Sequence, residues 1–104
     1  MLFRSTIFIV VNNGMFGTIR MHQERHYPGR ISGTALHNPD FAALARAYGA
    51  YGEAVTRTED FEAAFERAYS AGTAALLELR IDPDSVSLRA TLSSIRAEAL
   101  KNKK

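Results

Sequence analysis

The sequence contains no cysteine, which excludes disulfide bonds, thiolate catalysis and zinc–thiolate centres. It has no apolar run near the roughly 18 residues of a membrane span, and its first residues have no signal-peptide pattern. The Gly-x-Gly-x-x-Gly fingerprint of dinucleotide sites is also absent. Net charge is small, at +2, and the basic C-terminus comes without a nucleic-acid recognition motif. We therefore expect a cytoplasmic protein that binds neither membranes nor nucleic acid.

What is present fits one small folded domain. The chain has 104 residues, of which 46% are apolar, a composition typical of globular proteins. A domain of this size buries about two-thirds of the surface that its unfolded chain exposes. No internal repeat or low-complexity segment divides the sequence.

The most informative stretch is an apolar run that ends in polar residues. Ile7–Val11 consists of five consecutive apolar, mostly β-branched residues, and Asn12, Asn13 and Gly14 follow directly. Such a run predicts a strand of a parallel sheet that is buried on both faces. In open α/β sheets, ligands bind at the carboxyl ends of the strands. The sequence therefore predicts a polar turn at a position typical of ligand sites.

Further strands are predicted at residues 51–56 and 74–81, and helices lie between them. Asn38 is predicted to cap one helix, followed by Pro39 and Asp40, and Thr58 to cap the next. A short helix over residues 16–24 and a C-terminal helix from Leu88 complete the pattern. Strands that alternate with helices predict an α/β fold, a three-layer arrangement around a parallel sheet with right-handed crossovers.

The spacing of apolar residues also predicts which helix faces are buried. Gly49 and Gly72 are expected to end the two central helices. The aromatic residues on these helices are predicted to belong to the core. The predicted apolar faces are Phe41, Leu44, Ala45 and Tyr48; Phe61, Ala64, Phe65, Ala68 and Tyr69; and Leu88, Leu92, Ile95 and Ala99.

Taken alone, the Asn12-Asn13-Gly14 triplet has two interpretations. All three residue types favour turns, so the triplet is consistent with a simple strand-ending turn. Carboxamide and main-chain carbonyl oxygens are also suitable ligands for magnesium, which is usually held by a few protein groups together with phosphate oxygens.

The residues around the triplet resemble a known family. Val10–Arg20 is similar to the closing half of the thiamine-diphosphate motif of acetolactate synthase-like and related 2-oxoacid decarboxylase enzymes. The similarity continues through residues 38–45 and 55–61 and covers nearly the whole chain after Ser5. The Gly-Asp-Gly half of that motif is not in this sequence. We therefore expect residues 1–5 to be a non-native or truncated start, and residues 6–104 to be a partial thiamine-diphosphate-binding domain.

The resemblance implies a set of site residues. Asn13, through its side chain, and Met15, through its carbonyl, would bind the Mg²⁺ that bridges the diphosphate of the cofactor. Gly14 and Gly17 allow the backbone to come close, and the amides that open the following helix suit a diphosphate. The implied cofactor-binding residues are Asn13, Gly14, Met15, Phe16, Gly17, Thr18 and Ile19, although Ile19 is equally consistent with ordinary helix packing.

Other polar residues are weaker candidates for a functional role. His22 and His26 are four residues apart, as in metal-binding pairs, but no third ligand follows at suitable spacing. Arg20 or Arg25 could contact an acidic substrate. Asp40, Glu59 and Asp60 are explained as helix-start residues, so no catalytic role is predicted for them.

The resemblance implies part of an enzyme that uses thiamine diphosphate and Mg²⁺ to decarboxylate or join 2-oxoacids. The parent protein would be a homodimer or homotetramer, and its activating glutamate would come from another domain, so the chain alone is expected to be inactive. The alternative is a stand-alone α/β module that binds an anion or a partner without catalysis. The sequence does not distinguish a synthase from a decarboxylase, and it does not specify the 2-oxoacid or the acceptor.

Overall fold

The computed structural model describes residues 6–87 and 90–102, and they form two compact units. The sheet unit contains the described residues up to Asn12 together with Asn38–Ile81. The helical unit contains Asn13–His37 and the described residues from Asp82 onward. None of the helices within these described ranges is long and apolar enough to cross a membrane.

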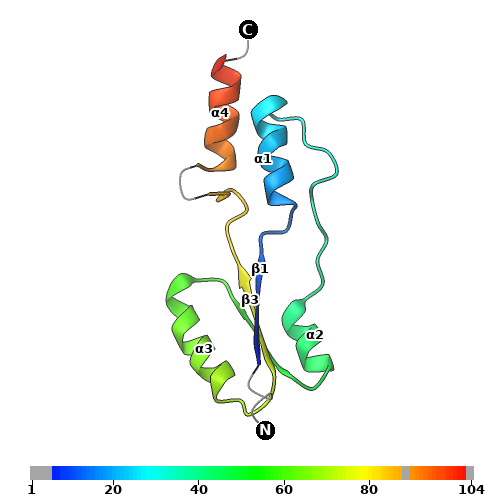
Figure 1. Cartoon of the computed structure of the whole chain (residues 1–104), viewed down its shortest axis with the longest axis vertical. Helices are drawn as coiled ribbons and strands as arrows, with labels where there is room; N and C mark the ends of the chain where they lie inside the picture. Colours follow the sequence, from blue (N-terminus) through cyan, green and yellow to red (C-terminus); the bar gives the residue numbers. More distant parts are fainter. Residues whose placement is uncertain (1–5, 88–89, 103–104) are drawn as a thin grey trace. The chain divides into compact units, whose positions relative to one another are not determined.

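The sheet unit is built on three parallel strands, as predicted (Figure 1). β1 (Ile7–Asn12) and β2 (Tyr51–Val55) both pair with β3 (Ala75–Arg80), so the strand order is β1-β3-β2. The chain between β1 and β2 forms α1 (Gly17–His26) and then helix α2 (Phe41–Ala47). A 3₁₀ turn, η2 (Thr58–Asp60), and helix α3 (Phe61–Tyr69) connect β2 to β3. The α/β class and the strand positions are therefore confirmed.

Helices α2 and α3 cover opposite faces of the sheet (Figure 1). On the α3 face, Ala64 and Ala68 pack with Val55, Ala75 and Leu77 in a buried cluster. On the α2 face, a Cβ atom added to Gly52 would lie 2.3 Å from the carbonyl oxygen of Ala42, so only glycine permits this approach. Small residues therefore set the distance between helices and sheet.

This close packing explains why part of the predicted core is wrong. Tyr48 and Tyr69 are 83% and 70% exposed, and Leu44 is also exposed. The helices contact the sheet through alanines, such as Ala42 and Ala45 on α2, which leaves the larger side chains on outer flanks. The other predicted aromatic residues are half-buried: Phe41, Phe61 and Phe65.

β1 departs from its prediction as a strand buried on both faces. It lies at the edge of the sheet, where Phe8, Ile9 and Val11 are 56%, 46% and 60% exposed. Among the described residues only β3 adjoins it, and α2 and α3 pack mainly over β2 and β3. An apolar run thus identified the strand correctly but not its number of neighbours.

The starts of both central helices also differ from the prediction. Asp40, rather than Asn38, caps α2, because its Oδ1 atom accepts a hydrogen bond of 3.1 Å from the amide of Ala43. Asn38 precedes a proline, which disfavours helical backbone, and its side chain is bonded elsewhere. Thr58 opens the 3₁₀ turn, and α3 begins three residues later without a side-chain cap. Gly49 and Gly72 have the left-handed backbone expected of them.

The helical unit contains α1 (Gly17–His26) and α4 (Leu92–Asn102), which pack against each other. Leu92 and Ile95 are buried and Ala99 is half-buried, as predicted, whereas Leu88 lies outside the described residues. A reciprocal capping box begins α4: Ser94 donates its amide to Thr91 Oγ1 at 3.1 Å, and the Thr91 amide donates to Ser94 Oγ at 3.0 Å.

Candidate functional site

The polar residues that follow β1 form a tight local turn in the helical unit. The side-chain oxygen of Asn13 accepts a hydrogen bond of 3.2 Å from the amide of Met15. Gly14 has a φ of 73°, a left-handed conformation that glycine adopts without strain. We call residues 13–17 the Asn13 turn. It is the turn that the sequence predicted.

The glycine that ends the Asn13 turn makes room for a carboxamide. A Cβ atom added to Gly17 would lie 2.8 Å from Nδ2 of Asn13. The Asn13 side chain therefore rests against the start of α1, where the first-turn amides have no carbonyl partner within the helix. The N-cap residue, Phe16, has no polar side-chain atom that could bond them. The Asn13 carboxamide thus lies next to helix amides that have no carbonyl partner within α1.

The Asn13 turn is held by the segment that follows α1. Phe16 donates its amide to the carbonyl of Thr34 at 2.9 Å, and Leu36 donates to the carbonyl of Gly14 at 2.8 Å. Thr34 is buried, and its hydroxyl donates to Gln23 Oε1 at 3.0 Å. These bonds fix the backbone on both sides of Met15. Among the described residues, the Met15 carbonyl oxygen has no hydrogen-bond donor.

The structure brings the predicted cofactor-binding residues into this one turn and the first turn of α1. Phe16 and Ile19 are 49% and 55% exposed, and Thr18 is exposed as well. Ile19 is therefore not explained by burial within the helical unit. Asn13, Gly14, Met15 and Gly17 are half-buried.

Sequence reasoning missed a second polar group, in the sheet unit at the carboxyl ends of β1 and β3. Asn12 Nδ2 donates to Glu78 Oε2 at 2.9 Å, and Asn38 Nδ2 donates to Asn12 Oδ1 at 2.8 Å. Arg80 Nε also donates to Glu78 Oε2, at 3.1 Å. We call Asn12, Asn38, Glu78 and Arg80 the strand-end cluster. The available signal was a glutamate between two leucines in a buried strand, with a carboxamide at the end of a neighbouring strand.

The two histidines do not build a metal site. The rings of His22 and His26 stack with centroids 6.2 Å apart. No group of three potential metal ligands occurs within residues 6–87 and 90–102. Their contact is explained as ring stacking along α1.

Arg20 is used structurally, in an ion-pair cluster of the helical unit. Glu24 is fully buried and accepts hydrogen bonds from Arg96 Nε and, at 2.7 Å, from Arg96 Nη2. Arg20 Nε lies 3.6 Å from Glu24 Oε1. Bonding by Arg96, with help from the Gly29 amide, lowers the pKa of Glu24 against the opposing effect of burial. The cluster joins α1 to α4.

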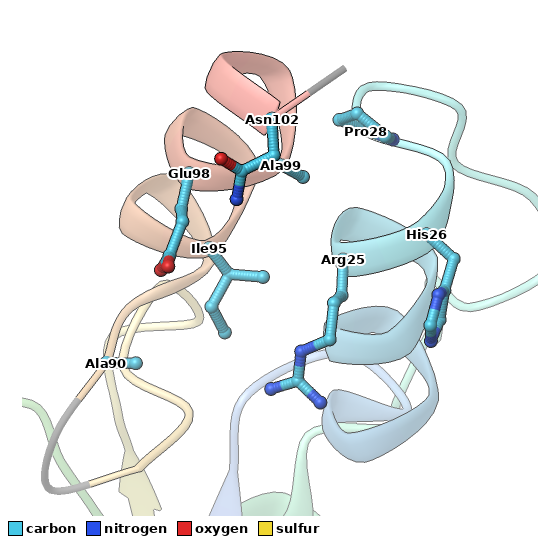
Figure 2. Close-up of a pocket in the computed structure, with 8 residues that line it drawn as sticks. All are labelled: Arg25, His26, Pro28, Ala90, Ile95, Glu98, Ala99 and Asn102. Carbon is cyan, nitrogen blue, oxygen red and sulfur yellow. The ribbon is translucent and has the colours of Figure 1, made fainter. Parts of the chain in front are cut away.

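A cavity of about 530 Å³ lies beside the same two helices (Figure 2). Figure 2 shows Ile95 of α4 and Arg25 of α1 pointing toward the space between the helices. None of the predicted cofactor-binding residues lines it. Its lining is Arg25, His26, Pro28, Ala90, Ile95, Glu98, Ala99 and Asn102.

A parallel sheet whose first strand leads into a polar glycine turn defines an α/β ligand-binding domain. Residues 4–79 match the family model of the thiamine pyrophosphate enzyme, C-terminal TPP binding domain. The chain belongs to this family, which confirms the resemblance seen in its sequence.

Similar proteins include three acetolactate synthases. The chain is 35% identical over 75 residues to acetolactate synthase isozyme 2 large subunit of Escherichia coli K12, a match that covers 71% of this chain and 14% of that protein. It is 34% identical over 65 residues to the large subunit of Haemophilus influenzae, covering 62% and 11%. It is 34% identical over 74 residues to the mitochondrial catalytic subunit of Saccharomyces cerevisiae, covering 71% and 11%. The chain thus spans only a small part of these relatives.

Proposed function

We propose that the Asn13 turn and the start of α1 hold the diphosphate of thiamine diphosphate together with Mg²⁺. The observation that carries this proposal is the Asn13 carboxamide, which is fixed by the Met15 amide and seated against Gly17. An amide oxygen has two lone pairs, so the bond from Met15 leaves one for a cation. The Met15 carbonyl offers a second oxygen. Both are of the type that Mg²⁺ prefers.

The residues at the start of α1 fit the diphosphate as well. The amides of Gly17, Thr18 and Ile19 open a ten-residue helix, whose N-terminal end carries partial positive charge. Gly14 and Gly17 keep side chains away from the approach to these amides. The exposed side chains of Phe16, Thr18 and Ile19 would then contact the rest of the cofactor or the substrate.

The reaction is proposed for an enzyme of the length of these relatives rather than for these 104 residues. When bound, thiamine diphosphate supplies the electron sink that lets a 2-oxoacid lose carbon dioxide and join an acceptor. The similarity of the chain to acetolactate synthases supports this proposed reaction. Because the chain covers 14% of the Escherichia coli relative, we expect it to be inactive alone while still carrying its part of the cofactor site.

The test compares an asparagine of the Asn13 turn with one outside it. Asn13→Ala should weaken Mg²⁺ binding, titrated at a fixed concentration of thiamine diphosphate, by about ten- to hundredfold, because a cation loses one charge-assisted contact of about 1.5–3 kcal/mol. Asn102→Ala is the matched control: Asn102 ends α4 and lines the cavity of Figure 2, not the Asn13 turn, so this change should leave Mg²⁺ affinity unchanged. Equal small losses in both variants would contradict the proposal.

Inorganic diphosphate distinguishes the alternative, a stand-alone anion-binding module. On our proposal, diphosphate binds weakly without Mg²⁺ and more tightly with it, and Asn13→Ala removes that difference. Diphosphate binding that ignores both Mg²⁺ and Asn13→Ala would favour the module and overturn the cofactor assignment.

A further inference from the structure

Glu78 is a buried carboxylate in the middle of a small sheet, only 2% exposed. One of its oxygens, Oε2, accepts from Asn12 and from Arg80. The other, Oε1, is buried and has no hydrogen-bond partner among the described residues. Most buried polar atoms in proteins are bonded, so this carboxylate requires an explanation beyond packing.

The sheet register explains why these residues meet. Val10 lies opposite Glu78, and Asn12 lies opposite Arg80. Side chains alternate between faces along a strand, so Asn12, Glu78 and Arg80 project from the same face near the carboxyl ends of β1 and β3. Asn38 reaches this face from the segment that leads into α2. Two other parts of the chain, β3 and the segment before α2, therefore converge on Asn12.

These bonds leave the Asn12 carboxamide no freedom. Its nitrogen donates to a carboxylate and its oxygen accepts from Asn38, so the group can neither rotate nor exchange its two ends without losing both bonds. A buried charge is expensive, and an apolar residue of similar volume would commonly stabilise such a site as well or better. Stability alone is thus a poor explanation of Glu78.

We propose that Glu78 is a positioning residue for the cofactor site: through Asn12 it fixes the end of β1, from which the Asn13 turn begins. This inference rests on the proposed function. Asn13 is joined to Asn12 by a peptide bond, so movement of the strand end changes where the metal-binding carboxamide starts. Arg80 takes part through its bond to the same oxygen, Glu78 Oε2, and its side chain is 49% exposed.

A polarity swap tests this link. Asn12→Asp places a second carboxylate against Glu78, and Glu78→Gln removes the charge-assisted acceptor. In the double variant, the new amide at position 78 can donate to the new carboxylate at position 12, which still accepts from Asn38. The double variant thus rebuilds the hydrogen bond between positions 12 and 78 with donor and acceptor exchanged. Two changes that only disrupt the structure would not restore binding in this way.

The readout is the affinity of the whole chain for Mg²⁺ with thiamine diphosphate, measured where circular dichroism shows every variant to be folded. We expect Asn12→Asp to weaken binding by about tenfold or more, Glu78→Gln by less, and the double variant to recover to within about threefold of wild type. Val55→Ala is the control: Val55 is buried on the α3 face, so it should lower stability and leave affinity unchanged.

The side-chain amide spectrum supplies an independent readout. The chain has four asparagines, at positions 12, 13, 38 and 102, and one glutamine, so each amide pair can be assigned. Glu78→Gln should shift the Asn12 and Asn38 pairs and, through them, the Asn13 pair, while Asn102 stays in place.

The outcomes are separable. Folded single variants that bind as wild type does would overturn the positioning role and leave the proposed function intact. A double variant no better than Asn12→Asp alone would also overturn it. Failure of the wild-type chain to bind Mg²⁺ and thiamine diphosphate at millimolar concentrations would overturn the proposed function, and the positioning role with it.

Discussion

Each unit of the chain buries one glutamate, and the two carboxylates are bonded differently. In the helical unit, both oxygens of Glu24 are bonded by Arg96, and the Gly29 amide donates to Oε2 at 3.3 Å. In the sheet unit, Glu78 has one bonded oxygen and one without a partner among the described residues. Glu24 is thus fully explained by the packing of α1 against α4, whereas Glu78 is not explained by packing.

The two units also differ in the kinds of residue that they bury. The core of the sheet unit consists of alanines and a few aliphatic side chains, whereas the helical unit buries the Glu24 carboxylate and Thr34 as well as Leu92 and Ile95. A fully paired buried charge, such as Glu24, is explained by its role in packing. Glu78 is incompletely paired and lies near the carboxyl ends of parallel strands, where ligand sites occur. We therefore relate it to the proposed site.

The largest expected effect tests whether the sheet unit depends on close contact. Gly52→Ala should lower the free energy of unfolding by about 3 kcal/mol or more, because its Cβ atom would meet the Ala42 carbonyl oxygen at 2.3 Å. Urea unfolding measures it. Gly29→Ala is the control: its Cβ would meet nothing within 4 Å, so only the strain of its φ of 78° should remain, about 1 kcal/mol. Equal losses would show that the contact with α2 is not tight.

A smaller effect is expected from the ion pair of the helical unit. Glu24→Gln should cost about 1–2 kcal/mol at neutral pH. The pKa of Glu24 is lowered by Arg96, so the pair stabilises the fold above the ordinary glutamate value of 4.5, and this stabilisation is lost as the pH falls through the lowered pKa. The difference between wild type and Glu24→Gln should therefore shrink in acid.

Glu53 provides the matched control in the sheet unit. Its pKa is also lowered, by the hydrogen bond from Arg67, but the two side chains are 26% and 51% exposed. Glu53→Gln should therefore change stability and its pH dependence less than Glu24→Gln does. A larger loss of stability in Glu53→Gln than in Glu24→Gln would contradict the view that the buried pair contributes more.

The smallest expected change in stability concerns the exposed edge of the sheet. Val11, 60% exposed on β1, is apolar on an edge strand, a position that favours association with other chains. Val11→Lys should change the free energy of unfolding by about 0.5 kcal/mol or less, yet reduce concentration-dependent association in light scattering. If Val11→Lys leaves association unchanged, the chain associates through a surface other than the β1 edge.

The sequence predicted the parallel sheet well because apolar runs, alternation with helices and glycine caps are local signals. It failed where the answer depends on partners distant in the chain. Asn38 reads locally as a helix cap, but its carboxamide is bonded to Asn12, twenty-six residues earlier. Local patterns give no partner for Glu78, and only the register with β1 shows that a donor lies beside it.

The predicted binding roles of the site residues stay a prediction. The order Asn-Asn-Gly gave the turn, and the family resemblance gave the roles proposed for Asn13 and Met15. The partners of Asn12 lie on β3 and before α2, which local patterns do not reveal.

The most direct test of the cofactor assignment locates the metal. Mn²⁺, an oxygen-seeking substitute for Mg²⁺, broadens the nuclear magnetic resonance signals of nearby atoms when it is titrated into the chain with thiamine diphosphate. We predict that broadening is strongest at the Asn13 side-chain amide and the backbone amides of Met15 and Gly17, and that it disappears in Asn13→Ala. Broadening centred on the rings of His22 and His26, and unchanged in Asn13→Ala, would contradict the account.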